Sequence, residues 1–169
     1  MKVLIACEYS GAVRDAFIKQ GHDAMSCDLL PTDVDGLHYQ GSVTDILHDG
    51  WDLMIAHPPC TYLAVSGNRW LYNKDGSRNE ERWDNRREAL DFVRLLMNAP
   101  IERIAVENPV SVISSEIRKP DQIIQPWQFG DEAQKTTCLW LKNLPKLKPT
   151  KIVGKGEFVT FKSGKKHPT

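Results

Sequence analysis

The chain has 169 residues, of which 41% are apolar and 26% are charged, and its formal net charge is zero. This length fits one domain with a substantial core, and no apolar run is long enough to cross a membrane, so we expect no membrane partner. Four cysteines without metal-ligand spacing or any sign of export predict free thiols in a reducing, cytoplasmic setting and no metal site.

The first half of the chain alternates between strand and helix signals. The continuous apolar run over residues 3–7 predicts a strand buried on both faces, and residues 11–20 predict a helix that Gly21 ends. A second short strand is expected over residues 22–27, with Asp28 at its end. Pro31 and Gly36 then mark a loop, and residues 43–47 predict a turn or short helix.

A third strand is predicted over residues 51–56, where two prolines, Pro58 and Pro59, end it. Residues 66–80 are polar and rich in glycine and asparagine, which predicts a loop. A long amphipathic helix over residues 80–98 and a strand over residues 101–106 follow.

The pattern changes after Pro109. A short helix is expected over residues 111–117, and two strands joined by a polar turn over residues 122–129 and 137–141. Strands that alternate with helices indicate α/β architecture with a Rossmann-like, mostly parallel sheet, and the final pair of strands indicates an antiparallel edge.

We predict a minimal single domain over residues 1–145, followed by a Lys-rich C-terminal tail over residues 146–169. Residues 142–169 carry eight lysines against one acid, Glu157, whereas residues 1–141 carry 14 basic and 21 acidic residues. The tail either contacts nucleic acid phosphates or is a solvated, partly disordered end of the chain.

Polar clusters follow three of the predicted parallel strands, at the sheet edge where ligands bind in open α/β folds. The first is Glu8-Tyr9-Ser10-Gly11, a turn into a helix whose N-terminus favours the anionic groups of a cofactor. The alternative is a plain turn that Ser10 caps. Asp28 is placed to accept hydrogen bonds from a ribose diol, or it caps the turn before Pro31.

The second cluster, His57-Pro58-Pro59-Cys60, follows the strand over residues 51–56. The two prolines fix the backbone, so they would hold the thiol of Cys60 in one place, and a thiolate there would be a strong nucleophile. Most free cysteines are instead small buried apolar residues, which suits Cys7, Cys27 and Cys138 better than Cys60.

The third cluster, Glu107-Asn108-Pro109, puts a carboxylate next to the middle of the sheet. It could grip the N3–N4 edge of a cytosine, or it could be a helix-capping or salt-bridged acid. The loop over residues 66–79 interleaves basic and aromatic residues, Arg69 among them, which suits base stacking and phosphate contact as well as an ordinary exposed loop.

In this order the clusters resemble the motifs of the DNA (cytosine-5) methyltransferases, most closely small phage and prophage methyltransferase-like proteins, over roughly residues 2–141. The resemblance implies a class I methyltransferase fold with S-adenosyl-L-methionine as cofactor. It implies that Cys60 adds to C6 of cytosine, that Glu107 holds N3, and that Lys135 is a basic residue facing the catalytic centre.

The remaining implied roles fall into two groups. The implied cofactor-binding residues are Glu8, Tyr9, Ser10, Gly11, Asp28, Asp45 in the adenine-binding segment, and Pro58. The implied substrate-binding residues are Pro59, Thr61, Asn108 and Arg69. The sequence departs from the family in having no glycine pair in the first motif, Ser42 in place of an acid, and Thr61 after the cysteine.

These observations predict an S-adenosylmethionine-dependent cytosine C5 methyltransferase that acts on DNA. One alternative is an enzyme on the same scaffold that modifies a free pyrimidine nucleotide, which the acidic body of the chain favours. Another is a catalytically degenerate homologue that binds DNA or a protein. A partner subunit or a homodimer could supply the DNA-recognition surface for which this chain has no separate domain.

Overall fold

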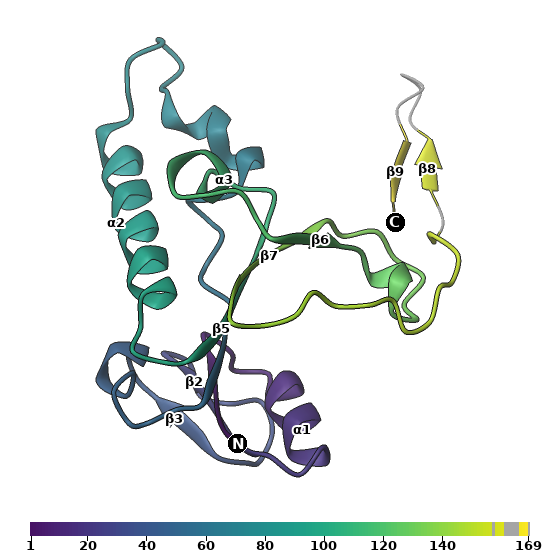
Figure 1. Ribbon diagram of the computed structural model, residues 1–169. Helices are drawn as coiled ribbons and strands as arrows, with labels where there is room; N and C mark the ends of the chain where they lie inside the picture. Colours follow the sequence, from purple (N-terminus) through teal and green to yellow (C-terminus); the bar gives the residue numbers. More distant parts are fainter. Residues whose placement is uncertain (157, 161–165, 169) are drawn as a thin grey trace.

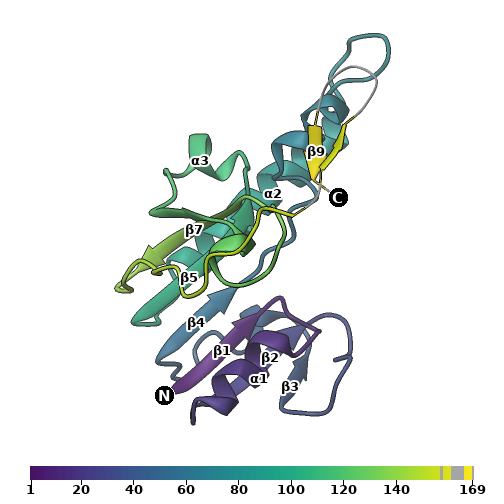
Figure 2. The ribbon, with the colours of Figure 1, turned by 90° about the vertical axis from the view of Figure 1, so that its right-hand side faces the viewer.

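A computed structural model describes residues 1–156, 158–160 and 166–168 of the chain. Its centre is a seven-stranded sheet with the strand order β3-β2-β1-β4-β5-β7-β6 (Figures 1 and 2). The strands are β1 (Lys2–Ala6), β2 (Asp23–Asp28), β3 (His38–Gln40), β4 (Leu53–Ala56), β5 (Arg103–Pro109), β6 (Gln122–Ile124) and β7 (Thr137–Lys142).

The first five strands of the sheet order are parallel to one another, and β7 runs antiparallel to both of its neighbours. The predicted Rossmann-like, mostly parallel sheet in a single α/β domain is therefore confirmed. The antiparallel member, β7, lies between β5 and β6, and β6 forms the edge of the sheet.

Helices cover both faces of the sheet. Side chains alternate along β1, so Val3 and Ile5 pack beneath α1 (Ala12–Lys19), whereas Leu4 faces the side covered by α2 (Glu80–Met97). All three are fully buried, and burying each such side chain stabilises the fold by about 1.5–3 kcal/mol. The short helix α3 (Ile113–Glu116) follows β5.

The strand order changes direction between β1 and β4. From β1 the chain moves outward through β2 to β3, and it then crosses back to place β4 on the other side of β1. The loops that follow β1 and β4 therefore leave the same edge of the sheet in diverging directions, which is where open α/β sheets bind ligands.

The edge strand β3 was not predicted from the sequence. It pairs with β2, and the loop before it is fastened by Arg14, a fully buried side chain of α1. Arg14 donates hydrogen bonds to the carbonyl of Asp35 at 2.9 Å and to the hydroxyl of Ser26 at 3.3 Å. The strand depends on these tertiary contacts, because three residues of local sequence carry little strand signal.

Two further predictions were wrong in detail. The predicted loop at residues 66–80 contains the 3-10 helix η2 (Val65–Leu71) and a bridge between Tyr72 and Arg78. β5 continues through Glu107 and Asn108, because its pairing with β7 extends the ladder to Pro109.

The strand predicted over residues 122–129 is also shorter in the structure. β6 ends at Ile124 and the 3-10 helix η3 (Pro126–Gln128) follows, because Pro126 has no amide proton to donate to a ladder. Residues 43–47 begin with the 3-10 helix η1 (Val43–Asp45), as predicted.

The C-terminal segment first runs beside residues 122–134. The amide of Leu147 donates to Gln122 Oε1 at 2.7 Å, and the amide of Val153 donates to the carbonyl of Trp127 at 2.9 Å. The strands β8 (Phe158–Thr160) and β9 (Lys166–Pro168) then form a separate two-stranded antiparallel sheet (Figure 1). Within the described residues, no helix is both long and apolar enough to cross a membrane.

Candidate active site at the carboxyl ends of the central strands

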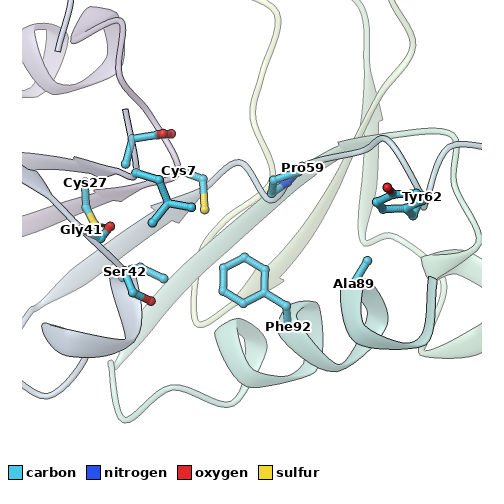
Figure 3. A pocket seen from close by; sticks show the side chains of 11 residues that line it. Cys7, Cys27, Gly41, Ser42, Pro59, Tyr62, Ala89 and Phe92 are labelled. Atoms are coloured by element: carbon cyan, nitrogen blue, oxygen red, sulfur yellow. Dashed lines mark hydrogen bonds between the residues drawn. The ribbon is translucent and has the colours of Figure 1, made fainter. Parts of the chain in front are cut away.

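A cavity of about 270 Å³ lies where β1, β2 and β4 end (Figure 3). Loops of the sheet form one wall, and Ala89 and Phe92 project from α2 to form the other. The lining residues are Cys7, Cys27, Asp28, Leu29, Gly41, Ser42, Val43, Pro59, Tyr62, Ala89 and Phe92. An apolar hollow with a few polar groups at its rim suits a flat ring system that carries a hydrogen-bonding edge.

Asp28 supplies the carboxylate of this cavity from the last position of β2. Its Oδ1 accepts a hydrogen bond from the amide of Leu30 at 3.0 Å. Its carbonyl accepts one from the amide of Gly41 at 2.9 Å, which brings Ser42 and Val43 alongside. Asp28 therefore lies where a ribose-binding acid is predicted.

Asp45 lies outside the cavity lining, although the sequence places it in the adenine-binding segment. It is exposed, and its Oδ2 accepts a hydrogen bond from the hydroxyl of Tyr39 at 3.1 Å. Ser42 and Val43 of the same segment line the cavity instead. The sequence could have indicated Ser42 as a lining residue only by its place directly after Gly41, three residues before Asp45.

Two thiols form part of the cavity wall. Cys7 has a left-handed backbone conformation with φ of 60°, and burial, assisted by the nearby charge of Asp28, raises the pKa of its thiol to about 12. Burial and Asp28 likewise raise the pKa of Cys27 to about 11. Both thiols are therefore protonated near neutral pH and act as apolar wall groups, as predicted for cysteines other than Cys60.

The loop after β1 closes on itself through Glu8. This buried carboxylate accepts hydrogen bonds from the amides of Val13 at 2.6 Å and Arg14 at 3.3 Å, and the hydroxyl of Ser10 donates to it at 3.2 Å. Glu8 thus accepts the hydrogen bonds of amides at the N-terminus of α1. The sequence predicts the anionic groups of a cofactor at this position.

The other predicted members of the first motif surround a neighbouring hollow. Tyr9 and Ser10 line it together with Glu8 and His57, and its volume is about 330 Å³. Gly11 has φ of +72°, and a Cβ atom there would lie 2.6 Å from Arg14 Nη2. Glycine is therefore required at this position by both the backbone conformation and the buried guanidinium.

The loop after β4 exposes its side chains while its backbone is held. Pro58 is buried, and its carbonyl accepts a hydrogen bond from Asn108 Nδ2 at 2.9 Å. Pro59, Cys60 and Thr61 are exposed, and Pro59 lines the cavity whereas Pro58 does not. The Cys60 thiol is therefore solvent-accessible on a fixed loop that borders the cavity.

Two arginines of α2 hold the next stretch of this loop. Arg82 Nη2 donates to the carbonyl of Thr61 at 3.2 Å, and Arg86, which is 6% exposed, donates to the carbonyl of Tyr62 at 2.9 Å and to Asn68 Oδ1 at 2.7 Å. Arg87 of the same helix instead pairs with Asp84, an acid of its own helix.

Glu107 is held by an unpredicted partner, His57. The Nδ1 atom of His57 lies 3.2 Å from Glu107 Oε2, which joins the ends of the adjacent strands β4 and β5. The Nε2 atom of His57 is buried without a hydrogen-bond partner among the described residues. A neutral His57 that donates from Nδ1 to Glu107 presents Nε2 as an acceptor.

Glu107 and Asn108 thus have distinct surroundings. The Glu107 side chain keeps 23% of its surface exposed beside His57. Asn108 is buried and contacts the backbone of the Cys60 loop through Pro58, so its position is that of a group that supports the loop. Its Oδ1 atom has no partner among the described residues.

The last two predicted residues lie at different places. Lys135 is exposed two residues before β7, whose first residue pairs with Pro109, so Lys135 enters at the same edge of the sheet as Glu107. Arg69 belongs to η2, and its guanidinium lies 4.5 Å from the ring centroid of Trp70, in a hollow separate from the cavity of Figure 3. Within the described residues, no group of three histidine, cysteine or acidic side chains could hold a metal ion.

No protein-family model and no curated protein matches the sequence. Among solved structures, the fold is similar to that of a candidate DNA modification methyltransferase encoded within a prophage (E. coli), with a TM-score of 0.53 and 15% sequence identity. The match covers 83% of this chain and 46% of that structure, so the chain spans about half of its length. At this identity the similarity establishes the shared fold.

Proposed function

We propose that the chain is an S-adenosylmethionine-dependent DNA methyltransferase that acts on cytosine C5 through the thiol of Cys60. The observation that carries the proposal is the position of Cys60. It is exposed on a loop whose backbone two prolines and Asn108 fix. The loop begins at His57, which contacts Glu107, and its Pro59 lines the cavity of Figure 3. The similarity of the fold to a methyltransferase structure supports the reaction class.

The cavity residues fit the nucleoside part of S-adenosylmethionine. Asp28 would accept hydrogen bonds from the ribose diol, and Val43 and Phe92 would contact the adenine ring. A volume of about 270 Å³ is near the lower end of small-molecule sites. When bound, the cofactor would supply the methyl group to C5 and leave as S-adenosylhomocysteine.

The side chains of this chain would act on the cytosine. The Cys60 thiolate would form a bond to C6, which pushes electron density onto C5. Glu107 would hold N3 as the ring accepts this electron density, and His57 would fix the orientation of Glu107 through the 3.2 Å contact. Once C5 is methylated, a base removes the C5 proton, the bond to C6 breaks and Cys60 is released. In duplex DNA the base must first be flipped out of the stack.

Incubation with methyl-labelled S-adenosylmethionine tests the proposal directly. We expect label on DNA, and with 5-fluorocytosine DNA we expect a covalent adduct, because fluorine at C5 blocks the final proton removal. The Cys60→Ser variant should lose the adduct completely. Cys138→Ala, which removes a buried thiol outside the cavity lining, is the matched control and should keep it. An adduct that survives Cys60→Ser, or absence of cofactor binding by calorimetry, contradicts the proposal.

A second candidate substrate is a free pyrimidine nucleotide. Residues 1–141 carry 14 basic against 21 acidic residues, whereas an enzyme that binds duplex DNA along a wide face should attract its phosphates. Labelling of free dCMP in the same assay, without labelling of DNA, would favour this candidate.

A further inference from the structure

Next to the Cys60 loop lies a second hollow of about 550 Å³, which η2, the turn after it and the start of α2 enclose. It is distinct from the cavity of Figure 3, since the two share no lining residue. We call it the η2 hollow. Its lining includes Arg69, Trp70, Tyr72, Lys74, Asn79 and Arg82.

The aromatic side chains of the η2 hollow are unusually exposed. Trp70 is 54% exposed and Tyr72 is 52% exposed, although large aromatic rings normally gain free energy by leaving water. The guanidinium of Arg69 lies over Trp70, and Tyr72 packs edge-on against Trp83. The hollow therefore offers exposed ring surfaces to a ligand.

The charge of the η2 hollow is opposite in sign to the net charge of residues 1–141 as a whole. Three cations, Arg69, Lys74 and Arg82, line it, and no aspartate or glutamate does. Residues 1–141 as a whole carry seven more acids than bases. A local excess of positive charge on an acidic body favours an anionic ligand at this place.

Exposed aromatic rings among cations suit an unpaired nucleotide, which carries both a base and phosphates. A base stacks on an exposed indole, and the adjoining phosphates pair with lysine and arginine. Duplex nucleic acid presents base edges and phosphates, but its base faces are covered by neighbouring bases. The exposed Trp70 and Tyr72 therefore favour a single strand over a duplex.

The η2 hollow is coupled to the reactive loop through Arg82. Arg82 lines the hollow and also donates a hydrogen bond to the carbonyl of Thr61, the residue that follows Cys60. A strand lying in the hollow would therefore pass beside the Cys60 loop. Figure 1 shows this segment beside the N-terminal end of α2.

We propose that the η2 hollow binds an unpaired DNA nucleotide adjacent to the target base, with Trp70 stacking on the base and Arg69 and Lys74 contacting its phosphates. The choice of DNA rests on the proposed function, whereas the single-stranded form follows from the exposed rings. The hollow would then provide part of the contact with DNA.

Fluorescence anisotropy with a labelled DNA strand of about 12 nucleotides, measured on the full chain without S-adenosylmethionine, tests this inference. Trp70→Ala should weaken binding roughly tenfold, within the range for loss of one base–aromatic stack, whereas Trp70→Phe should keep most of the affinity because it retains a ring. Arg69→Ala and Lys74→Ala should each reduce the slope of log affinity against log salt by about 0.7.

Arg103→Ala is the matched control for charge. Arg103 lies at the first position of β5, opposite the carboxyl edge, and pairs with Glu102. Its removal should leave the salt slope unchanged. The inference is overturned if Trp70→Ala binds the strand as tightly as the unaltered chain, if duplex DNA or an RNA of the same sequence binds more tightly, or if Arg103→Ala changes the slope as much as Arg69→Ala.

Failure of this inference and failure of the proposed function give different results. Strand binding that depends on Trp70, without any calorimetric binding of S-adenosylmethionine, would contradict the methyltransferase and leave the η2 hollow as a nucleic-acid site. Methylation of DNA that Trp70→Ala leaves unchanged, in both rate and affinity, would contradict the η2 hollow and leave the methyltransferase.

Discussion

The loops after β1 and β4 leave the same edge of the sheet from adjacent strands, but they use their polar groups in opposite ways. In the first loop the buried carboxylate of Glu8 turns back onto the amides of Val13 and Arg14. In the second loop the carbonyls of Pro58 and Thr61 accept hydrogen bonds from side chains of other elements, while Cys60 remains exposed.

This difference separates a loop that serves the fold from one that can present a side chain to a substrate. A side chain that anchors its own loop, as Glu8 does, has fewer hydrogen-bonding positions left for a ligand. A loop whose backbone is held from outside can present a side chain in a fixed position without using that side chain as an anchor. Preorganisation of this kind is what a covalent catalyst needs, because it lowers the entropic cost of bringing nucleophile and substrate together.

The thiols of the two loops show the same contrast, and the largest expected effect follows from it. Because burial raises the pKa of Cys7 to about 12, roughly one Cys7 thiol in ten thousand is ionised at pH 8. We therefore expect iodoacetamide to alkylate Cys60 more than about 100-fold faster than Cys7 at this pH, as measured by peptide mapping.

The pH dependence of this experiment has a definite sign. A thiol whose folded-state pKa lies above its ordinary value of 9.0 favours the folded state below about pH 9, and this contribution is lost as the pH rises toward 12. Because the ionised fraction of Cys7 rises with pH up to its pKa, labelling of Cys7 should become fast only as the pH approaches 12. Cys60→Ser should remove the fast phase of alkylation. A Cys7 thiol that reacts as fast as Cys60 at pH 8 would contradict the proposed difference between the two loops.

The external anchoring of the second loop predicts the next largest effect. Arg86→Met removes hydrogen bonds from a buried guanidinium to the carbonyl of Tyr62 and to Asn68. Hydrogen bonds to a charged group contribute about 1.5–3 kcal/mol, so we expect the free energy of unfolding to fall by about 2–3 kcal/mol in urea titrations.

Arg87→Met is the matched control, because Arg87 is the next residue of the same helix and pairs with Asp84 at the surface. It should change the free energy of unfolding by less than about 0.5 kcal/mol. Equal losses for the two variants would show that Arg86 is not an anchor of the Cys60 loop.

The sheet was predictable because its buried strands are continuous apolar runs, and the sequence marks where they end. Val3, Leu4 and Ile5 need no tertiary information to be assigned to a core strand. By contrast β3 depends on Arg14, which the sequence presents only as a charged residue in an amphipathic helix, and whose burial against Ser26 and Asp35 is set by the fold.

The position of the candidate site at one edge of the sheet could be predicted from the sequence. The contacts between its side chains could not, because they depend on the fold. Parallel strands deliver Asp28, Cys60 and Glu107 to one edge of the sheet, which the order of elements already implies. The contact of His57 with Glu107 joins residues 50 positions apart, and its side-chain geometry has no local signature. Short-range sequence patterns locate the ends of strands. Contacts between side chains at the ends of two different strands are set by the fold and cannot be found from such patterns.

The smallest effect concerns the self-contained loop after β1. Glu8→Gln keeps an oxygen that can accept a hydrogen bond from the amide of Val13 but removes the negative charge at the N-terminus of α1. We expect thermal and urea unfolding to report a loss of about 1 kcal/mol, the size of one helix cap. Glu81→Gln, the same change in the exposed first turn of α2, should cost only a few tenths of a kcal/mol. If Glu8→Gln costs no more than Glu81→Gln, the buried carboxylate is not stabilising the turn, and its place at the helix N-terminus would be better explained as a ligand site.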